Sequence, residues 1–227
     1  MTNNILALEK VHHRYSITRD IFNDISLTIE EGGFYFITGS SGAGKTTLLK
    51  LLSSTLRPTG GDVFFLGKNI NNIPQNKIYE IKRQIGYIFQ DFRLLPHLTT
   101  YENVALPLRV QNKREKNYKS DVIELLSWVN LEHCVHGYPN TLSGGEQQRA
   151  AIARAVISSP KLILADEPTG NVDNFNSEKI MRLFSEMNKM GTTIVIATHD
   201  QNLISKSIVN RKIIEIYNNS IRTIEEL

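Results

Sequence analysis

An α/β fold is predicted for this chain of 227 residues, with a mainly parallel sheet, an antiparallel β segment before it and an inserted helical part. Three observations predict this fold. Short apolar runs of strand length recur along the chain, segments with helical periodicity separate several of them, and the strand pattern disappears between about residues 91 and 160. Alternation of strands and helices is typical of a parallel sheet covered by helices.

The composition is that of an ordinary globular protein, with 41% hydrophobic and 22% charged residues, and it excludes a disordered or collagen-like chain. The formal net charge of +3 does not by itself require a nucleic-acid partner. The single cysteine, Cys134, excludes an intrachain disulfide and favours a reducing compartment such as the cytoplasm. Met1 to Leu8 lacks a secretory pattern, and no apolar run approaches the ~20 residues that span a bilayer.

The first third of the chain is predicted to contain antiparallel strands followed by a buried strand and a helix. Ile5 to Val11 and Ile25 to Ile29 form the antiparallel pair. Phe34 to Thr38 is an apolar run that ends at a glycine, as a buried strand does. A helix is expected over Thr46 to Leu56, stopped by Pro58 because proline lacks the amide N–H.

The middle of the chain begins with strands at Val63 to Leu66 and Ile85 to Phe89, with a helical stretch near Gln75 to Lys82 between them. Helices are expected from there to about Pro160. One of them is indicated by apolar residues at spacings of three and four, namely Val122, Leu125, Leu126 and Val129.

Strands return at Leu162 to Ala165 and Thr192 to Ala197. The helix between them carries apolar residues at the same spacing and ends at Gly191; the apolar residues are Ile180, Leu183, Phe184 and Met187. We therefore expect one domain, with residues 1–90 and 161–227 forming the core and residues 91–160 a helical subdomain.

A phosphate-binding loop is predicted between the strand at Phe34 and the helix that follows it. The segment matches G-x-x-x-x-G-K-[ST] and consists of Gly39, Ser40, Ser41, Gly42, Ala43, Gly44, Lys45 and Thr46, with Thr47 next. Glycines let backbone N–H groups surround phosphate oxygens, and the helix N-terminus adds partial positive charge. Lys45 is expected to reach the β- and γ-phosphates of a nucleotide, and the Thr46 hydroxyl to bind Mg²⁺.

Two acids end the strand Leu162 to Ala165, at the carboxyl edge of the sheet where open α/β folds bind ligands. Asp166 is placed to hold Mg²⁺, and Glu167 to orient or deprotonate a water that attacks the γ-phosphate. Acids at such a position often cap a helix instead, and the phosphate loop favours the catalytic interpretation.

The segment Leu142 to Arg149 resembles the signature motif of ATP-binding cassette (ABC) ATPases. Ser143 and Glu146 form a capping box that opens a helix, which leaves the backbone of Gly144 and Gly145 at the positive end of that helix. The resemblance extends over the whole chain and implies a P-loop NTPase core of the RecA-like type. It also implies Mg-dependent hydrolysis of ATP to ADP and phosphate.

Four further residues match the family pattern in order. The resemblance implies that Tyr15 stacks on adenine and that Gln90 senses Mg²⁺ and the attacking water. It implies that His199 contacts the γ-phosphate, and it identifies Asp173 as the D-loop aspartate. Gly33 and Gly170 to Val172 depart from the commoner family residues, but neither departure removes a catalytic group.

The resemblance also implies partners. In these ATPases each ATP lies between the phosphate loop of one cassette and the signature motif of another, which implies a head-to-tail dimer that binds two ATP through Ser143, Gly144 and Gly145. A single cassette favours a separate subunit on the cytoplasmic face of the membrane, docked on an integral, permease-like protein. The segment Arg109 to Lys119 has a local charge of +4, which suits an anionic surface, although basic loops are commonly just solvated.

Finer matches, among them Ile88 to Pro96 and Asp200 to Ile204, resemble the cell-division group of these cassettes. Members of that group pair with a membrane protein to regulate cell-wall hydrolases. Cassettes of lipoprotein-release and macrolide exporters share several of the motifs and are the nearest alternative. A soluble, nucleic-acid-associated ATPase is a more distant one, and it would show salt-dependent binding to RNA or DNA.

The close spacing of His133, Cys134 and His136 suggests a metal site as an alternative role for this segment. This interpretation is disfavoured because no second Cys/His pair in the sequence completes four ligands.

Overall fold

The computed structural model describes residues 3–16, 19–205 and 211–226. An antiparallel sheet has the strand order β2-β1-β4-β5, with β1 Asn4–Ser16, β2 Arg19–Glu30, β4 Gly60–Phe65 and β5 Lys68–Asn69. A second sheet has the order β10-β9-β3-β8-β7-β6, with β3 Phe34–Thr38, β6 Ile85–Ile88, β7 Leu162–Asp166, β8 Thr193–Ala197, β9 Arg211–Tyr217 and β10 Ser220–Glu226. Its strands are parallel except that β10 is antiparallel to β9.

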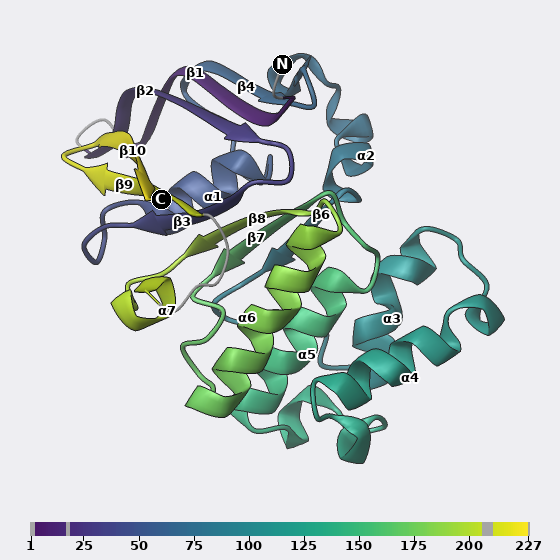
Figure 1. Cartoon of the computed structure of the whole chain (residues 1–227). Coiled ribbons are helices and arrows are strands. Elements are labelled where there is room, and N and C mark those ends of the chain that lie inside the picture. Colours follow the sequence, from purple (N-terminus) through teal and green to yellow (C-terminus); the bar gives the residue numbers. More distant parts are fainter. Residues whose placement is uncertain (1–2, 17–18, 206–210, 227) are drawn as a thin grey trace.

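Helices cover the second sheet on both faces (Figure 1). Helix α1 lies between the two sheets, whereas α5 and α6 lie on the opposite face and α3 and α4 pack beside α5. The helices are α1 Lys45–Leu52, α2 Tyr79–Lys82, α3 Thr100–Val110, α4 Lys119–Trp128, α5 Gly144–Val156, α6 Asn174–Lys189 and α7 Gln201–Ser205. None of these described helices has the length and apolar character needed to cross a lipid bilayer.

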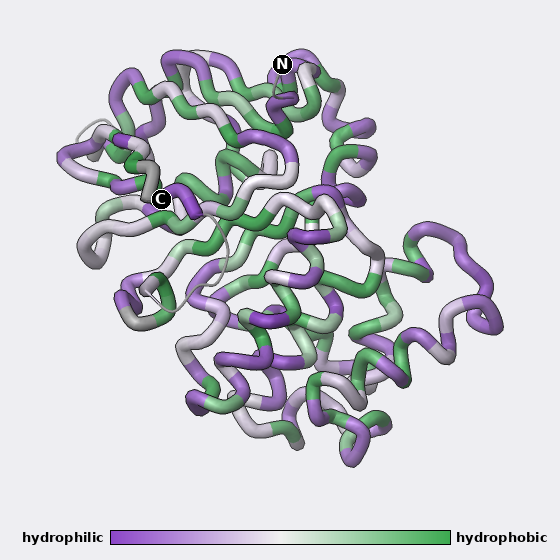
Figure 2. The backbone as a smooth tube through the Cα atoms, in the orientation of Figure 1, coloured by the Kyte–Doolittle hydropathy of each residue, from purple (hydrophilic) through white to green (hydrophobic). Residues whose placement is uncertain are grey.

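The central strands are buried on both faces because their side chains alternate between two cores. In β3, Tyr35 and Ile37 join the core around α1, while Phe34 and Phe36 join the core under α5 and α6. Strands β7 and β8 alternate in the same way. Figure 2 shows these strands as a hydrophobic band inside a more hydrophilic periphery. This explains why their sequences are continuous apolar runs.

The parallel strands end together at one edge of the sheet. Ala197 of β8 pairs with both Ile37 of β3 and Asp166 of β7, and Ile88 of β6 pairs with Ala165. The residues that follow these four strands therefore come from distant parts of the sequence to the same edge.

Most predicted elements are confirmed, including the antiparallel β1–β2 pair, strand β3 and the helix α6. This helix has Met190 as its C-cap, and Gly191 follows with a φ of +96°, as predicted for the residue that ends the helix. The prediction that the first helix extends to Leu56 is wrong. Helix α1 ends at Leu52 because Ser54 takes φ +56° and the amide of Leu56 turns back to the carbonyl of Lys50, before Pro58 is reached.

Two other predictions need correction, and one hairpin is missing from the prediction. The stretch Gln75 to Lys82 forms a 3₁₀ turn over Gln75–Lys77 and a single α-helical turn, α2. Strand β4 begins at Gly60, and it ends before Leu66, whose φ of +48° starts a turn. The hairpin β9–β10 was not predicted; Asn218 and Asn219, both with positive φ, make its turn.

Candidate nucleotide-binding site

The loop between β3 and α1 is folded around its own lysine. The Lys45 ammonium donates hydrogen bonds to the carbonyl oxygens of Gly39 at 2.8 Å and Ser40 at 3.2 Å. This places a positive charge inside the curve of the loop, where phosphate oxygens would be attracted to it.

The glycines of the loop are required by its geometry. Gly44, the N-cap of α1, has φ +110°, and a Cβ on it would lie 2.9 Å from a side-chain carbon of Ile21 and 3.0 Å from one of Phe22. Gly42 also has a positive φ, of +77°. Only glycine adopts these conformations without strain, so the motif spacing reflects backbone shape.

Glu167 lies just beyond β7 in a strained backbone conformation, with φ +48°. Its amide donates to the carbonyl of Ala197 at 2.9 Å, and its carboxylate accepts a hydrogen bond from the Thr198 hydroxyl at 3.1 Å. The other carboxylate oxygen is 2.7 Å from Nδ1 of His199. A left-handed conformation at a non-glycine residue costs about 1–3 kcal/mol and is concentrated at functional sites.

Asp166 is buried, with 4% of its surface exposed. Burial raises the pKa of its carboxyl, and the charge of Glu167 raises it further, whereas a hydrogen bond from Thr46 and the charge of Lys45 act in the opposite direction. Two adjacent acids in a partly buried site are stabilised by a cation. The Asp166 carboxylate and the Thr46 hydroxyl are hard oxygen ligands, and this donor set fits Mg²⁺.

One pocket of about 590 Å³ gathers most of the predicted site residues. Ile21 of β2 lines it as well, and no motif or periodicity in the sequence predicts this contribution. The predicted residues in its lining are Tyr15, Gly39, Ser40, Ser41, Gly42, Gly44, Lys45, Thr46, Thr47, Gln90, Asp166, Glu167 and His199.

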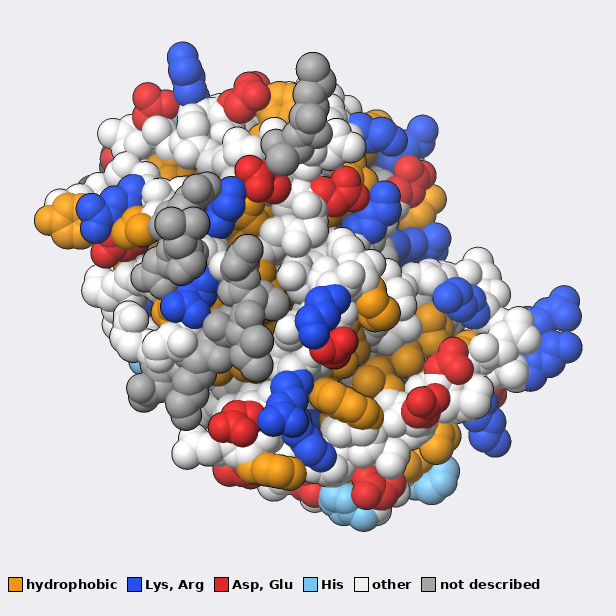
Figure 3. All heavy atoms as spheres, viewed as in Figure 1, with side chains coloured by type: hydrophobic (Ala, Val, Ile, Leu, Met, Phe, Trp, Pro, Cys, Tyr) orange, Lys and Arg blue, Asp and Glu red, His pale blue; other side chains and the backbone are white. Residues whose placement is uncertain are grey.

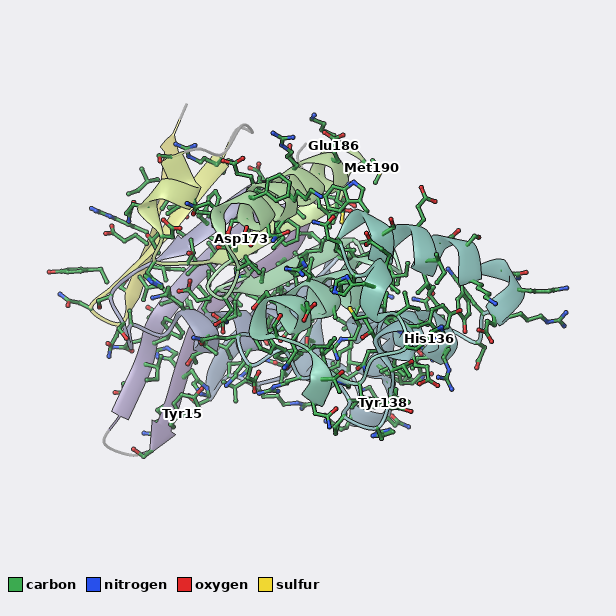
Figure 4. The ribbon with its side chains drawn as sticks, turned by 90° about the horizontal axis from the view of Figure 1, so that it is seen from below. Tyr15, His136, Tyr138, Asp173, Glu186 and Met190 are labelled. Carbon is green, nitrogen blue, oxygen red and sulfur yellow. The ribbon has the colours of Figure 1, made fainter. Side chains whose placement is uncertain are left out.

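Tyr15 flanks this pocket with an exposed ring, 53% of the residue being accessible. The rings of His13 and Tyr15 pack nearly perpendicular to each other at a centroid distance of 5.0 Å, and the phenol oxygen is 3.1 Å from the hydroxyl oxygen of Thr47. Figure 4 shows Tyr15 near the free end of the β1–β2 pair. The ring is therefore held in place while about half of the residue stays accessible to a ligand.

Ser143, Gly144 and Gly145 do not line the pocket, and neither does Ala43. Ser143 caps α5. Its amide and its hydroxyl both donate hydrogen bonds to the Glu146 carboxylate, at 2.8 Å and 2.7 Å. The Ser143 hydroxyl in turn accepts a hydrogen bond from the amide of Glu146, which completes the capping box. A Cβ on Gly144 would meet no atom within 4 Å. The start of α5 thus presents an open backbone outside the chain's own pocket.

Asp173 is the N-cap of α6, and one of its carboxylate oxygens accepts a hydrogen bond from the amide of Asn176 at 2.9 Å. It is exposed and lies outside the lining of the pocket. Within this chain the aspartate therefore has a structural role in starting the helix.

A phosphate loop between β3 and α1, with two acids at the end of the parallel strand β7, defines the class of P-loop NTPases. The sequence profile of the ABC transporter family matches residues 22–170, which is more than half of the chain. The chain belongs to this family, and it is an ATPase.

Similar proteins agree with this assignment. The cell division ATP-binding protein FtsE of Escherichia coli is 43% identical over 202 residues, covering 89% of this chain and 91% of that protein. FtsE of Bacillus subtilis is 40% identical over 201 residues, 88% of each chain. The ATP-binding cassette MJ0796, solved as a dimer in a post-hydrolysis state with ADP and Pi, has a TM-score of 0.90 at 35% identity, covering 97% of this chain and 98% of its own.

Proposed function

We propose that two copies of this chain bind two ATP molecules between them and drive a membrane partner of the FtsX type. The complex would act in cell division, by regulating the hydrolysis of the cell wall. The observation that carries the proposal is the separation of the two half-sites: the pocket around Lys45 is open, and the start of α5 lies outside it. A head-to-tail pair would bring Ser143, Gly144 and Gly145 of one copy to the γ-phosphate held by the other. The likeness to FtsE and to a dimeric cassette supports both parts of the proposal.

In each site the loop Gly39–Thr46 would hold the phosphates, and Thr46, Gln90 and Asp166 would hold Mg²⁺. The bound metal supplies positive charge to the phosphate oxygens. Glu167 would take a proton from a water molecule as that water attacks the γ-phosphorus and the bond to ADP breaks. His199 contacts the Glu167 carboxylate and would also contact the γ-phosphate.

Tyr15 would stack on the adenine ring. Replacing it with alanine removes a stacking contact of about 1 kcal/mol, so we expect ATP to bind about fivefold more weakly. Tyr15→Phe keeps the ring and loses only the contact to Thr47. Titration with ATP by calorimetry should give near-wild-type affinity for Tyr15→Phe; equal affinity for Tyr15→Ala and wild type would contradict the role.

A groove of about 370 Å³ is the proposed docking place of the membrane partner. Two of its lining side chains, Tyr79 and Val110, are large, apolar and about half exposed. The lining also includes Gly86 and Tyr87 of β6, the strand that leads to Gln90. A partner in this groove would therefore be connected to the nucleotide pocket through a single strand.

The basic segment Arg109 to Lys119 adjoins this groove and supports a location at the inner face of the membrane. Arg109, Lys113, Arg114, Lys116 and Lys119 are exposed, and no ion pair involves them in the described residues. Figure 3 shows Lys and Arg side chains gathered on the projection between α3 and α4. Such a cluster is attracted to an anionic lipid surface or to acidic loops of the partner.

The proposed partner is tested by co-purification with the FtsX-type membrane protein from the same organism. We expect Val110→Glu to abolish co-purification while the isolated chain still hydrolyses ATP, because the new charge would be buried in the groove. Ile123→Glu is the matched control, since Ile123 is a similarly exposed apolar residue on α4 outside the groove. If the wild-type chain did not co-purify with the FtsX-type protein and instead co-purified with a lipoprotein-release permease, the proposed partner would be wrong and the chain would be assigned to lipoprotein release.

A further inference from the structure

Three side chains of different chemistry meet at the amino end of α5. They are His133 and Cys134, in the 3₁₀ turn Glu132–Cys134, and Glu146 in the first turn of the helix. One ligand atom from each lies within 4.8 Å of the other two. His136, which the sequence suggested as a fellow ligand, does not belong to this group in the described part of the chain; Glu146 takes its place.

We propose that His133, Cys134 and Glu146 form a binding site for a single zinc-like transition-metal ion, with water as the fourth ligand. A thiolate, an imidazole and a carboxylate form the kind of mixed donor set that Zn²⁺ and Co²⁺ bind. Mg²⁺ and Ca²⁺ prefer oxygen ligands alone. The proposed ion is therefore distinct from the Mg²⁺ of the nucleotide pocket.

The distances are close to those of a tetrahedral site. Metal–ligand bonds of about 2.0–2.3 Å place ligand atoms roughly 3.3–3.8 Å apart. In the structure Nε2 of His133 is 2.7 Å from Oε1 of Glu146, and the most distant ligand pair is no more than 4.8 Å apart. Adjustments of about 1 Å suffice, and the His133 side chain is 59% exposed, which leaves it room to move.

The two oxygens of Glu146 have separate partners, which lets the metal bind without removing the helix cap. Oε2 accepts both hydrogen bonds from Ser143, whereas Oε1 faces His133. Hydrogen bonds from His133 and Ser143 hold the pKa of Glu146 at about 2, so its carboxylate is charged at neutral pH. Of the contacts that Glu146 makes, the ion would replace the one between Oε1 and His133 and leave those from Oε2 to Ser143 in place.

Binding requires one proton to leave. The Cys134 thiol, which donates weakly to the carbonyl of Leu131 at 3.4 Å, would release its proton to solvent and bind as thiolate. The proton on Nε2 of His133, which faces Glu146, would move to Nδ1 through solvent, so that the neutral imidazole binds through an unprotonated Nε2 without a second proton being released. The metal would then fasten the turn Glu132–Cys134 to the helix that begins with Ser143 and Gly144.

Titration of the purified full-length chain with Co²⁺, without nucleotide, tests the site. We expect a thiolate-to-cobalt charge-transfer band that saturates at one Co²⁺ per chain and disappears on addition of Zn²⁺. Cys134→Ser should abolish the band, and His133→Ala should weaken Co²⁺ binding at least tenfold. Glu146→Gln, which keeps an oxygen to cap Ser143, should weaken it as well.

His136→Ala is the matched control, because His136 is an exposed histidine close in sequence and outside the cluster. Figure 4 shows it near Tyr138, at the side of the molecule away from Tyr15. The His136→Ala variant should bind Co²⁺ with the affinity of the wild type. Absence of the band in the wild type, or an unchanged affinity in His133→Ala, would overturn the proposal; neither result depends on ATP hydrolysis or on a membrane partner.

Discussion

Glu167→Gln is expected to lower the rate of ATP hydrolysis by about 10³-fold while ATP still binds, because a positioned general base contributes about 10²–10⁴-fold. The amide of glutamine has the same shape as the carboxylate and can accept the hydrogen bond that Thr198 donates, so the strained turn at residue 167 should persist. Single-turnover hydrolysis and equilibrium ATP binding should be measured on the same preparation.

Glu186→Gln is the control for this substitution, since Glu186 is an exposed glutamate on α6 that forms an ion pair with Lys189 of the same helix. It should hydrolyse ATP at the wild-type rate. Hydrolysis by Glu167→Gln within a few-fold of wild type would remove Glu167 from the role of base and would direct attention to Asp166 or His199.

Lys45→Ala is expected to weaken ATP binding by about 10²-fold, because hydrogen bonds to charged groups contribute about 1.5–3 kcal/mol and the lysine would make contacts to two phosphates. The helix itself should remain, as alanine is a strong helix former at this first position of α1. Binding is measured by calorimetry with ATP and Mg²⁺, and the thermal unfolding midpoint is followed in parallel.

Lys189→Ala is the matched control, because it also removes one lysine charge but does so outside the lining of the nucleotide pocket. Lys189 is exposed at the end of α6, where it forms an ion pair with Glu186. Its ATP affinity should match that of the wild type. If Lys45→Ala bound ATP as tightly as Lys189→Ala does, the lysine would not contact the phosphates.

Residues of the nucleotide pocket could be predicted because local sequence determines their environment. The phosphate loop requires glycines at positive φ, and the acids follow an apolar run that can only be a buried strand. Strands buried on both faces leave a strong pattern, and parallel pairing brings their carboxyl ends together. The phosphate loop and the acids Asp166 and Glu167 could thus be assigned from the residues themselves, whereas Tyr15, Gln90 and His199 were assigned through the family resemblance.

Features that depend on distant contacts could not be predicted. Strand β9 pairs with β3, from the other end of the sequence, and its adjacent isoleucines, Ile213 and Ile214, break the alternation that indicates a strand. Ile21 lines the pocket only because the antiparallel sheet packs over α1. The contact between His133 and Glu146 likewise joins two turns whose meeting depends on tertiary packing.

Sedimentation of Glu167→Gln with ATP and Mg²⁺ tests most directly whether two copies complete each other's sites. We predict a species of twice the 25.8 kDa mass of one chain, with two ATP bound. Gly144→Asp in the same background should prevent this dimer, because the acid suits the start of α5 but repels the partner's γ-phosphate; Ser120→Asp, in the first turn of α4, should not. A chain that stays at 25.8 kDa while saturated with ATP would contradict the shared sites.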